Sequence, residues 1–372
     1  MIGMSAVIFI PDDTAKTGYP QPLMLQSVMG APLLAWLANA LFDSGVGRFF
    51  LVCHDRYVEA ARACLPAEAE VMTTMDSDPA DLLHVFLSTA EDAEHTITVV
   101  TGPAVYLPQL APQAAGRFPR VYGVSREELM QALDEHFSFA RFLLDNGSPM
   151  NEEQAMYSVA SPAELPEIAG LLQRNRLLAL ARTGVEIYDA SSCYVEPSVR
   201  VAPGARLLPG TMLRGKTVIG EEAVIGPWSV IDDSVIGARA VVNASQVRDS
   251  RVGQDAVVGP YASVRGGCEL GRSVRAGSFV ELKNARLGEN TQVPHLAYLG
   301  DTEAGANCNF GCGVTTANFD RVQKHETVVG EGAFIGCNTA LIAPLQVGSG
   351  AYIGAGSTIT EDVPAQALGI AR

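Results

Sequence analysis

The sequence has no long apolar run and few charged residues, and most of its charged residues are acidic. Charged residues make up 18% of the 372 residues and hydrophobic residues 48%, a composition that excludes a disordered or low-complexity chain. The apolar run at residues 6–10 is too short to span a membrane, and no basic residue precedes it, so it predicts a buried strand rather than a signal peptide. A net charge of −15 argues against nucleic acid and membranes as partners.

Cysteine is also scarce, and its pattern excludes a disulfide framework. The seven cysteines are an odd number in a long chain without a secretion signal, which predicts free thiols in a reducing cytoplasm. Cys308 and Cys312 form a single C-x3-C pair with no second pair nearby. Because a structural zinc site needs four ligands, we predict no metal site and interpret these two cysteines as small buried residues.

Glycine divides the chain into two parts, because only ten of the 36 glycines precede residue 183. In the first part short apolar runs alternate with helical patterns, which is typical of a parallel α/β sheet. The strands are predicted at 5–10, 48–53, 97–101 and 119–123, and the helices at 31–44, 56–64, 79–91, 125–146 and 161–182. The last two helices each begin with a capping box, at Ser125 with Glu128 and at Ser161 with Glu164.

From residue 195 onward, aliphatic residues recur every six positions. Many are followed by glycine or a small polar residue, as in IGEEAV, IGARAV and VGQDAV. This hexapeptide period predicts a β-helix in which each hexad forms one flat face of a triangular prism, with the aliphatic anchor pointing inward and the small residue allowing the corner. The anchors are Val195, Val201, Leu207, Leu213, Ile219, Ile225, Ile231, Ile236, Val242, Val252, Val258, Val264, Leu270, Ala276, Leu282, Val329, Ile335, Leu341, Val347, Ile353 and Ile359.

Two segments interrupt the hexapeptide period. Residues 317–327 (ANFDRVQKHET) have no anchor in register and predict a loop that leaves the prism. Residues 292–301 (QVPHLAYLGD) place His295 and Tyr298 where an ordinary hexad carries small side chains. Because function concentrates where a regular scaffold is interrupted, we expect the functional site at these segments, and we expect His325 in the loop to face solvent.

The second part also contains a set of motifs that resembles one known family. The motifs are GPYASVRGG, FVELKNARLG, PHLAYLGD, ANFD and ALGIAR, in the family's order and at nearly its spacing. The family is the bifunctional N-acetylglucosamine-1-phosphate uridyltransferase/glucosamine-1-phosphate acetyltransferases. The resemblance covers residues 185–372 and implies a left-handed parallel β-helix with acetyltransferase activity. It also implies acetyl-CoA as co-substrate, an amino-sugar phosphate as acceptor, a cytoplasmic location and a homotrimer.

The resemblance further implies roles for individual residues. The family's catalytic base falls on His295, the glutamate that orients this base on Glu281, and an asparagine near the transferred acetyl group on Asn318, so we expect a buried base with its orienting acid. The residues expected to bind the sugar phosphate are Arg265, Lys283, Tyr298, Asn309 and Lys324. The residues expected to contact acetyl-CoA are Cys312, Cys337, Ala355 and Arg372, of which the two cysteines replace small residues of the family.

The first part resembles the family's uridyltransferase domain in outline only. Asp12 and Thr14 occupy the positions of two phosphate-loop glycines, and Leu23 occupies the position of a lysine. Pro103 and Ala160 occupy the positions of two metal ligands. Because phosphoryl-type transfer depends on cations and metal to neutralise charge, we expect a truncated, degenerate nucleotidyltransferase-like domain without uridyltransferase activity.

These expectations divide the chain into a degenerate nucleotidyltransferase-like α/β domain at 1–124, a helical connector at 125–184 and an acetyltransferase β-helix at 185–372. Two alternatives stay open for the function. The chain could transfer an acyl group to a related amino-sugar phosphate, or it could be a non-catalytic partner of a separate uridyltransferase. The pair His295 and Glu281 favours catalysis, because a scaffold needs no base with an orienting acid.

Overall fold

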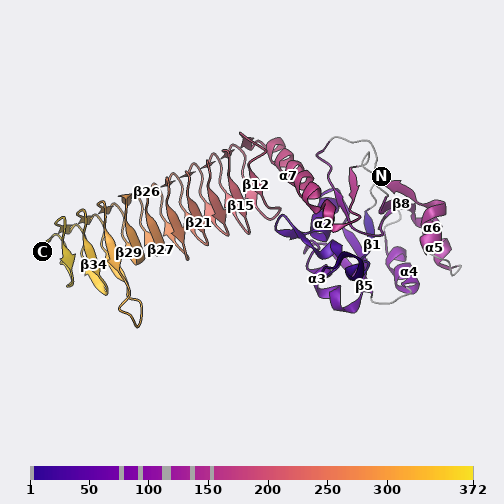
Figure 1. The fold of residues 1–372 in the computed structure, drawn as a ribbon, viewed down its shortest axis with the longest axis horizontal. Helices are drawn as coiled ribbons and strands as arrows, with labels where there is room; N and C mark the ends of the chain where they lie inside the picture. The colour runs from indigo at the N-terminus through magenta and orange to yellow at the C-terminus, as the bar shows by residue number, and fades with distance from the viewer. Residues whose placement is uncertain are drawn as a thin grey trace. The chain divides into compact units, whose positions relative to one another are not determined.

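The computed structural model describes residues 4–74, 79–90, 95–110, 119–134, 139–150 and 155–371. The chain forms two compact units, Met1–Leu178 and Ala179–Arg372, each of which is visible in Figure 1. The boundaries predicted at 124/125 and 184/185 do not coincide with this division. Among the described residues, no helix combines the length and the apolar character that crossing a membrane requires.

The first unit is built on a six-stranded sheet with the spatial order β5-β4-β1-β6-β8-β9. The strands are β5 (Glu70–Thr74), β4 (Arg48–Val52), β1 (Ser5–Phe9), β6 (Thr96–Val100), β8 (Val121–Ser125) and β9 (Ser148–Met150). The first four are parallel to one another, whereas β8 runs antiparallel to β6 and β9 antiparallel to β8. The prediction of a parallel sheet is therefore wrong at this edge, because β8 and β9 join the sheet in antiparallel pairs.

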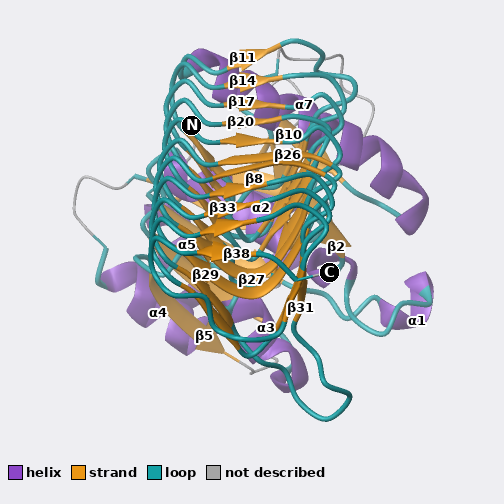
Figure 2. Cartoon of the chain, turned by 90° about the vertical axis from the view of Figure 1, so that its left-hand side faces the viewer, coloured by secondary structure: helices purple, strands orange, loops and turns teal. Residues whose placement is uncertain are grey.

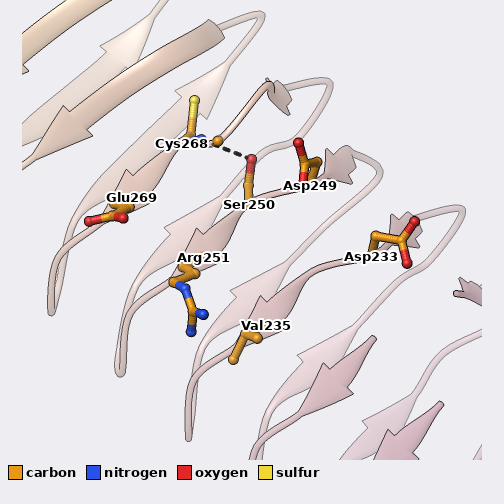
Figure 3. A pocket seen from close by; sticks show the side chains of 8 residues that line it. Asp233, Val235, Asp249, Ser250, Arg251, Cys268 and Glu269 are labelled. Carbon is orange, nitrogen blue, oxygen red and sulfur yellow. Dashed lines mark hydrogen bonds between the residues drawn. The ribbon is translucent and has the colours of Figure 1, made fainter. Parts of the chain in front are cut away.

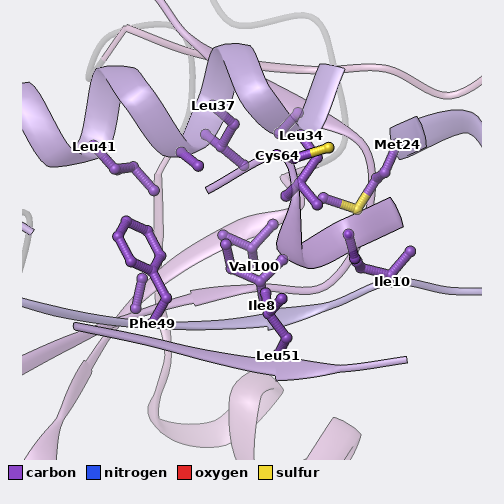
Figure 4. Close-up of a cluster of buried hydrophobic side chains, with 14 of the residues drawn as sticks. Ile8, Ile10, Met24, Leu34, Leu37, Leu41, Phe49, Leu51, Cys64 and Val100 are labelled. Atoms are coloured by element: carbon purple, nitrogen blue, oxygen red, sulfur yellow. The ribbon is translucent and has the colours of Figure 1, made fainter. Parts of the chain in front are cut away.

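Helices cover both faces of this sheet. The helix α2 packs on the face that carries Ile8 and Phe49, as Figure 4 shows, and α4, α5 and α6 pack on the face that carries Val7 and Phe50. Successive side chains of a strand point to opposite faces, so strands covered on both sides read as continuous apolar runs. The helices and remaining strands are α1 (Thr14–Thr17), η1 (Leu23–Leu25), β2 (Ser27–Val28), β3 (Ala31–Pro32), α2 (Leu33–Asp43), η2 (Asp55–Tyr57), α3 (Val58–Arg62), α4 (Ala80–Ser88), β7 (Ala104–Tyr106), α5 (Arg126–Asp134), α6 (Phe139–Asn146), β10 (Met156–Ser158), η4 (Pro162–Glu164) and α7 (Leu165–Arg182).

The second unit is a left-handed parallel β-helix with three flat faces. Its strands form an 11-stranded sheet, which we call face one, and a 17-stranded sheet, which supplies faces two and three. Each strand pairs in parallel with the equivalent strand of the next coil, and Figure 2 shows face one as a stack from β11 to β38. Because every coil contacts only its neighbours, the position of a residue within a coil fixes which residues stack on it.

Face one consists of β11 (Glu186–Ile187), β14 (Arg206–Leu207), β17 (Val224–Ile225), β20 (Val241–Val242), β23 (Val257–Val258), β26 (Arg275–Ser278), β28 (Gln292–His295), β30 (Asn309–Phe310), β33 (Phe334–Ile335), β36 (Tyr352–Ile353) and β38 (Leu368–Gly369). Face two consists of β12 (Tyr194–Val195), β15 (Met212–Arg214), β18 (Val230–Asp232), β21 (Gln246–Arg248), β24 (Ser263–Arg265), β31 (Thr315–Ala317), β34 (Ala340–Ile342) and β37 (Thr358–Ile359). Face three consists of β13 (Arg200–Val201), β16 (Val218–Ile219), β19 (Val235–Ile236), β22 (Arg251–Val252), β25 (Glu269–Leu270), β32 (Thr327–Val329) and β35 (Leu345–Val347). The longer strands β27 (Glu281–Leu287) and β29 (Tyr298–Ala304) bend from face two into face three.

The hexapeptide anchors form the core of the prism as predicted. Every predicted anchor is buried except Val201, which is half-buried. The glycines that follow many anchors are required for a different reason from the predicted corner turn. A Cβ at Gly237 would lie 2.6 Å from the backbone nitrogen of Gln254, and one at Gly220 would lie 2.6 Å from that of Ala238. Glycine is needed at these positions because the backbone of the next coil approaches too closely for a side chain.

The two predicted interruptions of the repeat differ in the structure. The chain does leave the prism between β31 and β32, as Figures 1 and 2 show, so the loop prediction for 317–327 is confirmed. Residues 292–301, in contrast, form an ordinary coil, with β28 and β29 in register with their neighbours. Residues 292–301 therefore differ from an ordinary hexad in their outward-facing side chains, whereas their backbone follows the regular coil.

Candidate functional site

Four predicted site residues stack on one another at the corner between faces one and two. Ser278 pairs with His295, and the registers on both sides of this corner stack His295 on Cys312, Cys312 on Cys337 and Cys337 on Ala355. Neighbouring strands of a sheet lie about 4.8 Å apart. His295, Cys312, Cys337 and Ala355, which we call the corner column, therefore form a continuous line along one edge of the prism.

The corner column presents its side chains outward. His295 and Cys337 are exposed and Cys312 is half-buried. Within the described part of the chain, the side chain of His295 has no hydrogen bond or ion pair, and in the single chain it is exposed where we expected a buried base. Its position at a convex corner explains this exposure. The fourth predicted acetyl-CoA contact, Arg372, lies outside the described residues.

Three predicted phosphate ligands gather at the other end of face two. Arg265 on β24 and Lys283 on β27 are paired in register, and Lys324 in the loop lies beside them. The Lys324 ammonium, followed by the Arg265 guanidinium, lowers the pKa of Lys283. We call Arg265, Lys283 and Lys324 the cation group. Because mutual repulsion opposes such a gathering, it is best suited to hold an anion such as a phosphate.

Glu281 pairs with the cation group and not with His295. Its carboxylate oxygen Oε1 accepts hydrogen bonds from Nε of Arg265, at 3.2 Å, and from Nη2 of the same guanidinium. The predicted pair of base and orienting acid is therefore not formed in this structure. Both members of the ion pair are about four-tenths exposed, and ion pairs this open to solvent contribute little stability. An anion that engages Arg265 would release Glu281 at small cost.

Tyr298 and Asn318 meet above a glycine next to the cation group. A Cβ built on Gly300 would lie 2.4 Å from the phenol oxygen of Tyr298 and 2.7 Å from Nδ2 of Asn318. Nδ2 of Asn318 donates a hydrogen bond to Asp301, whose other oxygen accepts from Asn284 at 2.7 Å. The missing side chain of Gly300 thus leaves room for these two polar groups. Our sequence reasoning missed Asp301, although the quoted motif PHLAYLGD contains it.

The loop between β31 and β32 is braced by one carboxylate. Asp320 accepts hydrogen bonds from the backbone nitrogens of Val322 and Gln323, each at 2.8 Å, and contacts Nε2 of His325 at 2.7 Å. These bonds, led by that of Gln323, lower the pKa of Asp320. His325 is thus a bracing residue within the loop, and the expectation that it merely faces solvent is wrong. The brace fixes the loop segment that carries Lys324.

Asn309 does not join the cation group within one chain. It lies on β30 of face one, where it pairs with Gln292 and Phe334, whereas Arg265, Lys283 and Tyr298 lie on face two. A single prism therefore presents three separate sets of predicted site residues: the corner column, the cation group with its neighbours, and Asn309.

The five degenerate positions of the first unit carry no cationic side chain, and the positions of the two metal ligands carry Pro103 and Ala160. Asp12 accepts hydrogen bonds from Thr14 and pairs with Arg56. Leu23 is 1% exposed within a core cluster. Pro103 is buried. The backbone nitrogen of Ala160 donates a hydrogen bond to the carboxylate of Glu164 at 3.3 Å.

Two hollows on the second unit lie away from the predicted residues. A cavity of about 210 Å³ is lined by Asp233, Val235, Asp249, Ser250, Arg251, Gly267, Cys268 and Glu269, and Figure 3 shows it. A second, of about 410 Å³, lies on later coils between Val328 and Ala365. Neither is lined by any predicted site residue. Across the described residues, no three His, Cys, Asp or Glu side chains come together as a metal site.

These features define the second unit as a hexapeptide-repeat β-helix with an exposed histidine and a cation group on one face. Residues 326–361 match the bacterial transferase hexapeptide (six repeats) family. The chain is also similar to proteins named bifunctional protein GlmU. It is 43% identical over 226 residues to that of Clostridium perfringens (strain SM101 / Type A), covering 61% of this chain and 50% of that protein. It is 44% identical over 209 residues to that of Brevibacillus brevis, covering 56% and 45%.

These relatives confirm the resemblance found in the sequence. The chain spans about half the length of the curated relatives it matches. Among solved structures, the UDP-N-acetylglucosamine acyltransferase of Francisella novicida is similar at 19% identity and a TM-score of 0.31, covering 50% of this chain and 66% of that one.

Proposed function

We propose that the second unit transfers an acetyl group from acetyl-CoA to the amine of glucosamine-1-phosphate, and that it does so in the cytoplasm. One observation carries the proposal: the exposed His295 and the small side chains of the corner column border the same face as the cation group. An outward line of small side chains suits an extended thioester arm. Three cations suit the phosphate of an amino sugar.

The chemistry follows from these groups. The neutral imidazole of His295 takes a proton from the ammonium group of the acceptor, and the amine nitrogen then attacks the thioester carbonyl carbon. A C–N bond forms, the nitrogen of the tetrahedral intermediate loses its second proton, the C–S bond breaks and CoA leaves as a thiolate that takes up a proton. The amide of Asn318, beside Tyr298, is the candidate donor to the oxyanion of that intermediate.

Glu281 acquires its role when the acceptor binds. The sugar phosphate competes with Glu281 for Arg265, because a phosphate accepts hydrogen bonds from guanidinium at least as well as a carboxylate does. The freed carboxylate is then available to orient His295 and to stabilise its protonated form. The acceptor phosphate therefore assembles the acid–base pair that the free chain lacks.

We also propose that the active form is a homotrimer. Trp228, Tyr261, Phe279 and Leu296 stand at one corner of the prism and are 58–71% exposed, and the rings of Tyr261 and Phe279 stack at 5.2 Å. We call these four residues the apolar ridge. Exposed apolar surface of this kind marks an interface, and only a neighbouring copy could bring Asn309 to the cation group. A prism with three faces packs naturally about a threefold axis.

For the first unit we propose that uridyltransferase activity is lost. Asp12 is engaged with Thr14 and Arg56, and Leu23 is a core residue, so a nucleotide triphosphate would meet a carboxylate where it needs cations. Incubation with UTP, N-acetylglucosamine-1-phosphate and magnesium should give no sugar nucleotide. Formation of the sugar nucleotide at a rate above that of a control without the protein would overturn this part of the proposal.

The acetyltransferase proposal is tested by following free thiol release from acetyl-CoA with glucosamine-1-phosphate as acceptor. We expect release that depends on both substrates. A panel of other amino-sugar phosphates separates this acceptor from a related one. Absence of thiol release with every acceptor, together with co-purification of a uridyltransferase, would favour the non-catalytic alternative.

A further inference from the structure

Two thiols stack directly on each other in the corner column. The register between Phe310 and Ile335 before the corner, and that between Thr315 and Ala340 after it, both place Cys337 on Cys312. The backbone nitrogen of Asn338 donates to the carbonyl oxygen of Cys312 at 2.7 Å. Stacked residues lie about 4.8 Å apart, which falls within the roughly 4.4–6.8 Å between Cα atoms that a disulfide spans.

These two cysteines also differ from the others in accessibility. Cys337 is exposed and Cys312 is half-buried, whereas the remaining five are buried. Burial raises the pKa of each of those five thiols, in the case of Cys64 to about 11. Since the thiolate is the reactive form, oxidation selects accessible cysteines over buried ones. The chain thus places its two most accessible thiols next to each other.

We propose that Cys312 and Cys337 are a thiol–disulfide exchange site that closes to an intrachain disulfide with a low-molecular-weight disulfide, such as CoA disulfide, as the oxidant. The two residues follow His295 in the corner column, on the next two coils. The choice of CoA disulfide rests on the proposed function, because its pantetheine arm is that of the proposed co-substrate. Oxidised glutathione is a disulfide of the same class without that arm.

The exchange proceeds in two balanced steps. The exposed Cys337 thiolate attacks one sulfur of the small disulfide, so that an S–S bond to the protein forms, the original S–S bond breaks and one thiolate leaves. The Cys312 thiolate then attacks the Cys337 sulfur, forms the intrachain bond and releases the second thiolate. The protein loses two electrons and two protons, and the small disulfide is reduced to two thiols. An excess of free thiol reverses both steps.

The closed disulfide would lie across the corner column, along which the proposed thioester arm must pass to reach His295. The two Sγ atoms would be drawn together over the corner at Gly311, where Sγ of Cys337 is only 2.9 Å from the position of an added Cβ. We therefore expect acetyl transfer to fall in proportion to the oxidised fraction, and to return with dithiothreitol.

The experiment incubates the full chain with CoA disulfide, or separately with oxidised glutathione, and analyses it by mass spectrometry after non-reducing trypsin digestion. Cys312 lies in the peptide 287–321 and Cys337 in the peptide that begins at His325. We expect these two peptides to become linked, with a mass loss of two hydrogens. Cys312→Ser and Cys337→Ser should each abolish the link, whereas Cys193→Ser, a buried cysteine on the first coil, should leave it intact.

Each result decides a separate point. Three results would overturn the exchange site. The first is no link at all, and the second is a link that survives in Cys312→Ser through Cys308. The third is a stable mixed disulfide that does not proceed to the intrachain bond. If the link forms but the oxidised chain turns over as fast as the reduced chain, the proposal that the disulfide blocks acetyl transfer is overturned. A link in a chain that shows no acetyl transfer before oxidation would leave the exchange site standing and refute the proposed function instead. Closure at lower concentrations of CoA disulfide than of oxidised glutathione would support recognition of the pantetheine arm, and equal concentrations would exclude it.

Discussion

At the scale of single residues, the exposure of His295 governs what its removal will do. The side chain stands at a corner and contributes nothing to the packed core, so a change there is felt in chemistry and not in folding. The same holds for Glu281, whose side chain pairs with that of Arg265 while both remain about four-tenths exposed. Activity and stability therefore separate cleanly at these two positions.

We predict that His295→Ala lowers acetyl transfer by roughly 10²–10⁴-fold, the usual share of a general base. Glu281→Gln should cause a smaller loss in the same direction. Turnover is to be measured together with the melting temperature and the binding of acetyl-CoA, both of which should stay near wild type. An alanine variant that turns over within a few-fold of wild type would remove His295 from the role of base.

The cation group makes a prediction about pH. The Lys324 ammonium lowers the pKa of Lys283, so Lys283 loses its charge at a lower pH than an ordinary lysine does. The KM for the sugar phosphate should therefore rise on the alkaline side earlier than an isolated lysine would allow. In Lys324→Gln the pKa of Lys283 lies higher, so this rise moves to higher pH, although binding near neutrality is weaker.

The measurement is KM for the sugar phosphate against pH in wild type and Lys324→Gln, with Lys216→Gln on an early coil as the control. The amine of the acceptor titrates equally in all three, so the difference between profiles reports the cation group. Superimposable profiles for wild type and Lys324→Gln would show that Lys283 does not hold the phosphate.

At the scale of elements, the sequence predicts coils well and outward surfaces poorly. Inward anchors such as Ile335 recur with the hexapeptide period because each coil must fill the same core. The period cannot predict what an outward side chain meets, since this depends on the neighbouring coil and on the loop. The pairing of Glu281 with Arg265 and the brace formed by Asp320 could not be predicted for this reason. The strand at β8 was predicted at 119–123, but its antiparallel direction was not, and the three-residue strand β9 was not predicted, because strand direction and pairing depend on long-range contacts.

The braced loop between β31 and β32 gives the next prediction. Asp320 accepts three hydrogen bonds that lower its pKa, so its stabilising contribution is complete above the ordinary pKa of a carboxyl group. That contribution is lost only as the pH falls towards the lowered pKa in strong acid. At neutral pH, Asp320→Ala should loosen the loop and misplace Lys324. We expect an increase of up to about 10²-fold in KM for the sugar phosphate, with little change in melting temperature because the loop is exposed.

The matched control for this prediction is Asp362→Ala, which removes another exposed carboxylate that accepts a backbone hydrogen bond, from Gln346 at 2.8 Å. It lies outside the loop and should leave KM unchanged. Equal KM values for Asp320→Ala and wild type would mean that the brace does not position Lys324.

At the scale of the whole molecule, the predicted site residues of one chain do not come together in one place. The corner column, the cation group and Asn309 stand on different parts of a convex prism, and the loop carries Phe319 and Val322 at 61% and 88% exposure. A convex body cannot enclose a substrate by itself, so the proposed reaction requires a second surface. The apolar ridge, adjacent in sequence to the corner column, is the surface at which a further copy of this chain would supply one.

We therefore predict that the chain is a trimer in solution and that Phe279→Glu combined with Tyr261→Glu dissociates it. The two aromatic rings stack on each other, and replacing them with carboxylates puts like charges into an interface that would otherwise bury them. Light scattering should give three times the chain mass for wild type and one for the variant. The variant should lose acetyl transfer but keep the circular dichroism of the β-helix, because both side chains point away from the core.

Tyr188→Glu, which changes an equally exposed aromatic residue on the first coil, should stay trimeric and active. A wild-type chain that is both monomeric and active would contradict the shared site, and so would a ridge variant that dissociates without loss of turnover.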